Sequence, residues 1–119
     1  MGMESASHRI LALLKKGINP KGMHDILTYF QEAGISTEVG IMAGFPSETS
    51  HDLNETYQFL LKHRKAMTRC DIGKFRLLRG SPIAMDPKRY GIKFTGNPEN
   101  YWYHLPYEIA VDYEAFRLF

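Results

Sequence analysis

The chain has 119 residues, of which 44% are hydrophobic and 24% charged, and its formal net charge is +2. This length favours a single domain and is short for a complete (β/α)8 barrel, which needs about 250 residues. The single cysteine, Cys70, excludes an internal disulfide framework and a multi-cysteine metal site. The sequence contains no basic stripe of the kind that would indicate a nucleic-acid partner. No apolar run approaches the roughly 20 residues that span a membrane, and no N-terminal signal pattern occurs, so the sequence predicts a cytoplasmic protein without a membrane partner.

Two helices are predicted before the first long strand. Apolar residues at helical spacing mark the first helix within residues 10–14, and Gly17 is its predicted C-terminal cap. Asn19 and Pro20 begin the second helix as N-cap and first helical residue, and Gly34 ends it. The predicted buried face of this second helix carries Met23, Ile26, Leu27 and Phe30.

The clearest strand is predicted from Ile35 to Ala43. Side chains alternate between the two faces of a strand, and here the odd positions are largely β-branched and apolar. This face is predicted to pack under helices. A parallel sheet buried on both sides would be apolar on both faces, so the second face, which is small or polar, is predicted to be open to a ligand. Its members are Ser36, Glu38, Gly40, Met42 and Gly44.

A helix, a strand and an irregular tail complete the predicted order of elements. Thr49 or Ser50 is the predicted N-cap of the helix, which ends near Met67. Residues 70–78 form the predicted strand, and the aromatic stretch 101–107 is predicted to cover a core or to contact a partner. Strands that alternate with helices predict an α/β fold with parallel neighbouring strands.

Five short motifs follow one another along residues 2–92. They are Gly2-Met3-Glu4-Ser5-Ala6-Ser7, Leu14-Lys15-Lys16-Gly17, Ala33-Gly34-Ile35, Gly44-Phe45-Pro46-Ser47-Glu48-Thr49 and Gly80-Ser81-Pro82. In this order and spacing they resemble the second half of a radical S-adenosylmethionine (radical SAM) enzyme, and most closely the branch that often carries a cobalamin-binding domain. The resemblance implies a partial TIM-type βα barrel. Residues 1–92 would be the C-terminal half of the barrel and residues 93–119 an aromatic tail.

The resemblance also implies a reaction and a set of cofactors for the parent protein. In the family, a [4Fe-4S] cluster held by a Cys-x3-Cys-x2-Cys loop reduces S-adenosylmethionine to a 5′-deoxyadenosyl radical, which abstracts hydrogen from the substrate. The parent would therefore be an iron-sulfur oxidoreductase that uses S-adenosylmethionine and [4Fe-4S], and cobalamin use stays open. The chain departs from the family because the cysteine loop and the first three strands are absent, and Cys70 cannot supply three thiolates. We therefore expect a fragment that is inactive alone, holds no cofactor, and has the missing N-terminal half of the barrel as its partner.

The S-adenosylmethionine site follows from the resemblance residue by residue. Gly40, Met42 and Gly44 match the family's Gly-x-Ile-x-Gly-x-x-Glu, which lines the adenine. Missing side chains let a flat ring approach the backbone, and methionine offers a soft apolar contact. Glu4 and Ser5 match the polar pair that meets the methionyl amino group or the ribose. The alternative interpretations are an ordinary βα turn at Gly44 and a solvated acid at Glu4.

Three charged residues are weaker candidates for substrate contacts. Glu38 lies on the open strand face, and Arg76 and Arg79, near the end of the last strand, can bind an anionic substrate; ordinary surface charge is the alternative for all three. No metal ligand is predicted, because the histidines do not fall at metal-ligand spacing. No catalytic residue is predicted, because nothing in the chain can inject the electron that the family's reaction needs. The alternative function is a small α/β nucleotide-binding or interaction domain without catalysis. In either case open sheet edges favour self-association.

Overall fold

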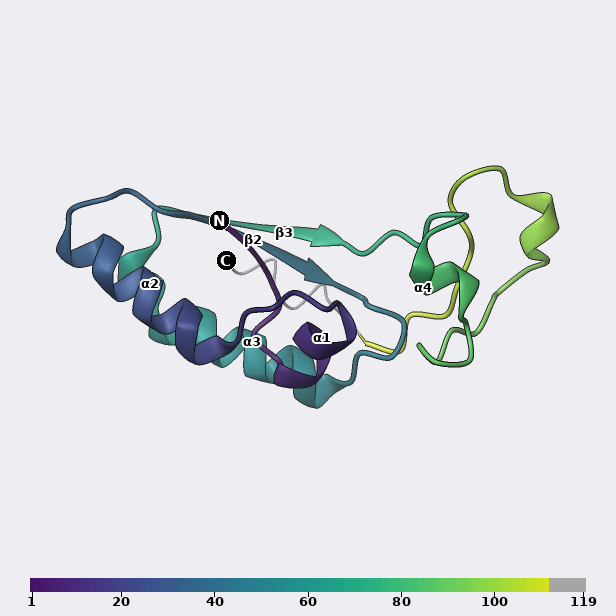
Figure 1. Cartoon of the computed structure of the whole chain (residues 1–119), viewed down its shortest axis with the longest axis horizontal. Helices are drawn as coiled ribbons and strands as arrows, with labels where there is room; N and C mark the ends of the chain where they lie inside the picture. Colours follow the sequence, from purple (N-terminus) through teal and green to yellow (C-terminus); the bar gives the residue numbers. More distant parts are fainter. Residues whose placement is uncertain (112–119) are drawn as a thin grey trace.

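A three-stranded parallel sheet organises the computed structural model, which describes residues 1–111. The strands lie in the order β1-β2-β3, and helices cover one face of the sheet (Figure 1). This arrangement confirms the predicted α/β fold with parallel neighbours. The strands are β1 (Gly2–Glu4), β2 (Glu38–Ala43) and β3 (Arg69–Lys74). The connections contain α1 (His8–Leu13), α2 (Pro20–Glu32), α3 (Ser50–Lys62) and the short 3-10 helix η1 (Arg64–Ala66).

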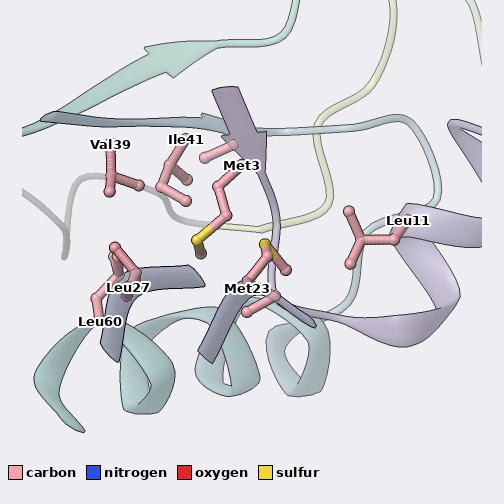
Figure 2. Packing of buried hydrophobic residues seen from close by; sticks show 9 residues of the cluster. Met3, Leu11, Met23, Leu27, Val39, Ile41 and Leu60 are labelled. Carbon is pink, nitrogen blue, oxygen red and sulfur yellow. The ribbon is translucent and has the colours of Figure 1, made fainter. Parts of the chain in front are cut away.

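The main core lies between the sheet and α2 and α3 (Figure 2). The odd positions of β2 point into it, whereas Glu38 on the other face is exposed. The predicted alternation of β2 is therefore confirmed. Burial of apolar surface is the main favourable term in folding. The packing of the helices against one face of the sheet therefore fixes the position of the strands, and with them the opposite, open face. The buried side chains are Met3, Ala6, Leu11, Met23, Leu27, Val39, Ile41, Ala43 and Leu60.

Local capping signals define the starts of the two long helices. The Asn19 side chain accepts a hydrogen bond from the Gly22 backbone N–H at 2.9 Å, and Pro20 opens α2 as predicted. Thr49 caps α3 and forms a capping box with Asp52, each side chain binding the backbone N–H of the other. These contacts satisfy N–H groups that have no partner within the helix.

Three predictions about the helices were wrong. α1 ends at Leu13, and Lys15 with φ of 51° turns the chain before Gly17 is reached, so Gly17 is not the direct cap. Ile26 and Phe30 are exposed, because the buried face of α2 is narrower than its apolar pattern and no further layer covers its flank within residues 1–111. The predicted single helix to residue 67 is divided, with α3 ending at Lys62 and η1 following.

The strand predicted from Ile35 was too long at its amino end, and the strand predicted over residues 70–78 was too long at its carboxyl end. Ile35 is 51% exposed, and β2 begins only at Glu38, which pairs with Arg69, the first residue of β3. The strand predicted to reach residue 78 ends at Lys74, because its partner β2 ends at Ala43. Strand length is thus set by the partner and not by the apolar run alone.

Residues 75–111 leave the sheet and form a lobe beyond its carboxyl end (Figure 1). The lobe contains α4 (Pro82–Met85) and the 3-10 helix η2 (Pro98–Asn100). A second core joins the lobe to Ile10 of α1 and to Phe45 after β2. Leu105 from the aromatic stretch is part of that core, whereas Trp102 is 94% exposed. Residues 112–119 of the predicted tail lie outside the described residues. Within residues 1–111, no helix combines the length and apolar character needed to cross a membrane.

Candidate functional site

The open face of the sheet presents bare backbone at Gly40. Gly40 is the register partner of Gly2 in β1 and of Asp71 in β3. A Cβ placed on Gly40 would find only the Met1 carbonyl oxygen, at 3.9 Å, within contact range. Among residues 1–111, apart from the chain neighbours of Gly40, no side chain lies within 4 Å of that Cβ position, so a flat group can approach the main chain there.

The carboxylate of Glu4 lies next to this surface. Its Oε1 atom is 2.9 Å from the position that a Cβ on Gly2 would take, and it accepts a hydrogen bond from Lys16 Nζ at 3.1 Å. Glu4 has φ of 65°, a left-handed conformation that few non-glycine residues adopt, and β1 is irregular between Gly2 and Glu4. The structure thus places the Glu4 carboxylate over Gly2, on the strand that pairs with Gly40, although Glu4 and Gly40 are far apart in the sequence.

Ser5 lies on the other side of the sheet from Gly40. It is buried, its hydroxyl shares a hydrogen bond of 3.1 Å with Thr56 Oγ1, and it accepts the Ser7 backbone N–H at 3.1 Å. The Thr56 hydroxyl also accepts the Ala6 N–H at 3.0 Å. In this arrangement Ser5 ties the loop after β1 to α3. Its predicted ligand contact stays a prediction.

Gly44 differs from Gly40 because the chain itself covers it. Its φ of 86° is a conformation that favours glycine. Its N–H donates to Glu48 Oε2 at 2.7 Å, and its carbonyl accepts the Tyr107 hydroxyl at 2.7 Å. Ile109 Cγ2 lies 3.5 Å from where a Cβ would be. Both backbone polar groups of Gly44 therefore have partners within the chain.

The pKa values of two acidic residues near this turn are shifted in opposite directions. Burial raises the pKa of Glu48, and the hydrogen bond from the Gly44 N–H offsets this only in part. For Asp52, burial acts in the same direction, but hydrogen bonds from Arg9, Ser7 and Thr49 outweigh it and hold the pKa well below its usual range. The difference arises because Asp52 has a cation and hydroxyl donors, whereas Glu48 is buried with backbone donors.

The remaining predicted residues occupy different places. Met42 is half-buried and packs against the second core, with Gly73 as its register partner in β3. Glu38 is exposed on the same face as Gly40. Arg79 lies in the lobe, where Nε and Nη2 donate to the Tyr101 carbonyl at 3.1 and 2.8 Å, and Arg76 is exposed. Their ligand and substrate contacts stay predictions.

The histidines and the cysteine form no metal-binding group in the described part of the chain. Among residues 1–111, no set of three or more His, Cys, Asp or Glu side chains could hold a metal ion. His24 Nδ1 and His63 Nε2 are 2.6 Å apart, and His63 Nδ1 donates to the Phe59 carbonyl at 2.8 Å. Burial raises the pKa of the half-buried Cys70 thiol, and Asp71 adds to this shift.

The polar network that joins the loop after β1 to α3 was not predicted from the sequence. Asp52 accepts the Ser7 hydroxyl at 2.6 Å and forms an ion pair with Arg9, and Arg9 also donates to Ser47 in the turn after β2. Asp52 and Thr56, four residues apart on the buried side of α3, were the available signal. Polar residues at that spacing on an inward face indicate buried hydrogen-bond partners.

Comparison with known proteins shows likeness to parts of larger enzymes. No family model matches the chain. A threonylcarbamoyladenosine tRNA methylthiotransferase from Aquifex aeolicus is 31% identical over 62 residues, which is 50% of this chain and 15% of that protein. An uncharacterized methyltransferase from Pyrococcus horikoshii is 36% identical over 61 residues, or 51% of this chain and 13% of that protein. The matched region is thus a small part of each relative.

Proposed function

We propose that the chain is the second half of a radical SAM barrel, and that the open face of its sheet forms part of an S-adenosylmethionine site. The observation that carries this proposal is the bare backbone at Gly40, with the Glu4 carboxylate beside it. In parallel α/β sheets, ligands bind outside the carboxyl ends of the strands. Similarity to a methylthiotransferase and a methyltransferase supports the same interpretation.

Each residue has a separate task in this proposal. The adenine lies against the main chain at Gly40, and Met42 supplies an apolar contact from the same strand face. The Glu4 carboxylate accepts hydrogen bonds from the methionyl ammonium or from ribose hydroxyls. Lys16, which donates to Glu4, holds that carboxylate in place.

The rest of the parent enzyme supplies what this chain lacks. A [4Fe-4S] cluster, held by the other half of the barrel, would inject the electron that cleaves S-adenosylmethionine. In this proposal residues 1–92 contain the barrel portion, with residues 75–92 already in the lobe beyond the sheet, and residues 93–119 are a C-terminal extension. The missing half also contributes to the site, so the chain alone binds S-adenosylmethionine weakly, with a dissociation constant on the order of millimolar or above. Cobalamin is not part of this proposal.

A second candidate is a self-contained α/β domain that binds a nucleotide without catalysis. One observation favours it: the turn at Gly44 is closed by contacts within the chain, from Glu48 on one side and Tyr107 on the other. A domain that works alone would close its own sheet end in this way. Such a domain would bind a nucleotide tightly and would not require the methionine portion of S-adenosylmethionine.

Titration of the chain with S-adenosylmethionine, followed by amide NMR, tests the proposal. We expect shifts at Glu4, Gly40 and Met42 that Gly40→Ala abolishes. The structure accommodates this change, because the nearest atom to the new methyl is 3.9 Å away, so the urea midpoint of unfolding should stay the same or rise slightly. The matched control is Gly22→Ala in α2, where the nearest atom is 3.7 Å away; it should bind like the unaltered chain.

Two results would contradict this proposal. If Gly40→Ala leaves binding unaffected, the binding site does not lie on the open face of β2. Tight binding of adenosine alone would favour the self-contained domain. The coding sequence upstream of Met1 provides an independent test, since a Cys-x3-Cys-x2-Cys motif there supports the radical SAM parent and an unrelated fold there opposes it.

A further inference from the structure

We infer that residues 105–111, here called the strap, occupy the Gly44 end of this ligand site, so that S-adenosylmethionine must displace the strap to bind fully. The inference rests on the proposed function. Figure 1 shows the chain returning from the lobe toward the carboxyl end of β2 before the described residues end. The strap therefore lies where ligands of parallel sheets bind.

One hydroxyl group connects the strap to two strands. The Tyr107 hydroxyl is 2.7 Å from the Gly44 carbonyl oxygen and 2.9 Å from the Phe75 carbonyl oxygen. Gly44 directly follows β2, and Phe75 directly follows β3. The Tyr107 ring also meets the Phe75 ring edge to face, with centroids 6.0 Å apart. Tyr107 thus contacts both strand ends through its hydroxyl and its ring.

A second side chain fills the space that Gly44 leaves empty. Ile109 Cγ2 and Cδ1 lie 3.5 and 3.8 Å from the position of a Cβ on Gly44. At Gly40, by contrast, the nearest atom is a backbone oxygen at 3.9 Å. The two glycines of the motif therefore differ, since one is bare and the other is covered by Ile109.

The strap is held at several points along its length. The Leu105 N–H donates to the Leu77 carbonyl at 2.8 Å, and the Glu108 N–H donates to the Lys93 carbonyl at 2.7 Å. Phe94 and Tyr107 also form an antiparallel bridge. Leu105 is buried. These contacts make the strap a specific element of the fold, and its release has a measurable cost.

Ligand and strap compete for the same backbone. An adenine edge that reads the Gly44 carbonyl must share it with the Tyr107 hydroxyl, and a ring that lies on Gly44 must displace Ile109. Removal of the Tyr107 hydroxyl weakens the strap by about one hydrogen bond. Because the apparent affinity scales with the fraction of chains that are open, we expect Tyr107→Phe to bind S-adenosylmethionine about fivefold tighter.

The experiment compares variants in amide hydrogen exchange and in S-adenosylmethionine titration. In Tyr107→Phe, the Glu108 amide should exchange about fivefold faster and binding should tighten by a similar factor. Ile109→Ala should also tighten binding. Because it leaves the Tyr107 hydroxyl in place, it provides a second test if Tyr107→Phe folds poorly. Tyr103→Phe is the matched control, because Tyr103 is an exposed tyrosine of the neighbouring loop, and it should change neither quantity.

The outcomes separate this inference from the proposed function. Tighter binding in both strap variants supports the inference. If Gly40→Ala abolishes binding but both strap variants leave it unchanged or weaken it, the strap inference is overturned. The proposed function then still stands. If Gly40→Ala leaves binding unchanged, both in the otherwise unaltered chain and in the strap variants, the strap inference and the proposed function are both overturned.

Discussion

The carboxylate of Asp52 joins the loop after β1 to the start of α3, and its removal tests how this loop is held. Asp52 accepts the Ser7 hydroxyl at 2.6 Å and the Thr49 N–H at 2.8 Å, and it forms an ion pair with Arg9. Asp52 is 3% exposed and Ser7 is fully buried. In Asp52→Ala, therefore, the Ser7 hydroxyl loses its acceptor where water does not replace it.

The expected loss in the free energy of unfolding is about 2–5 kcal/mol. The unsatisfied Ser7 hydroxyl costs about 1–3 kcal/mol, and the lost half of the capping box at Thr49 costs about 1 kcal/mol. The Arg9 side chain is 46% exposed, so the ion pair adds only about 0–1 kcal/mol. Asp52→Asn keeps one acceptor oxygen and should lose about half as much. A domain near the middle of the usual range of roughly 5–15 kcal/mol would still fold.

Urea unfolding followed by circular dichroism measures this loss. Because the pKa of Asp52 is lowered in the folded state, its contribution is present above its ordinary pKa of about 4 and disappears as the pH falls below that value. The gap between Asp52→Ala and the unaltered chain should therefore be large near about pH 7 and smaller near about pH 3. Asp71→Ala is the control, because it removes an exposed ion pair with Arg69 of 2.9 Å and should cost under about 0.5 kcal/mol. Equal losses in the two variants would refute the reasoning.

Three further predictions follow from the same contacts. Burial raises the pKa of Glu48, so the unaltered chain should lose stability as the pH rises from about 4.5; Glu48→Gln, which keeps an acceptor for the Gly44 N–H, should flatten this part of the urea-midpoint profile. Burial lowers the pKa of His63, and His24 and Lys62 add to this shift, so stability should fall as the pH drops below about 6.5; His63→Phe should remove that loss, and an unchanged profile would contradict the assignment. The outer edges of β1 and β3 have no partner strand within residues 1–111, so sedimentation velocity should show association that grows with concentration; a monomer at all concentrations would oppose this.

Features decided by neighbouring residues could be predicted from the sequence. Asn19 and Thr49 cap their helices because a cap acts within three residues. The two faces of β2 were predictable because a strand alternates with a period of two. The open strip at Gly40 follows from the same alternation once Val39 and Ile41 are assigned to the core.

Features decided by distant residues could not be predicted in this way. Tyr107 and Gly44 are separated by 63 positions, and Ser5 and Thr56 by 51, so no local pattern connects them. Glycine at position 44 signals an unusual backbone, but it does not tell whether a ligand or the chain itself fills the space. The strand ends were missed for the same reason, since the length of β2 depends on where its partners begin and end.

The glycines of the sheet favour a functional reason for the open face over an accidental one. Gly2, Gly40 and Gly73 lie on the same face, and none of them faces the helices. A glycine within a strand costs roughly 0.5–1 kcal/mol relative to alanine, and the positions of Gly40 and Gly73 have room for a methyl group, with the nearest atoms at 3.9 Å. Packing therefore does not require glycine at these two positions. A surface kept bare at a cost in stability is typical of a site where another molecule approaches the backbone. If Gly40→Ala and Gly73→Ala together raised stability without weakening any binding, this reason for the open face would disappear.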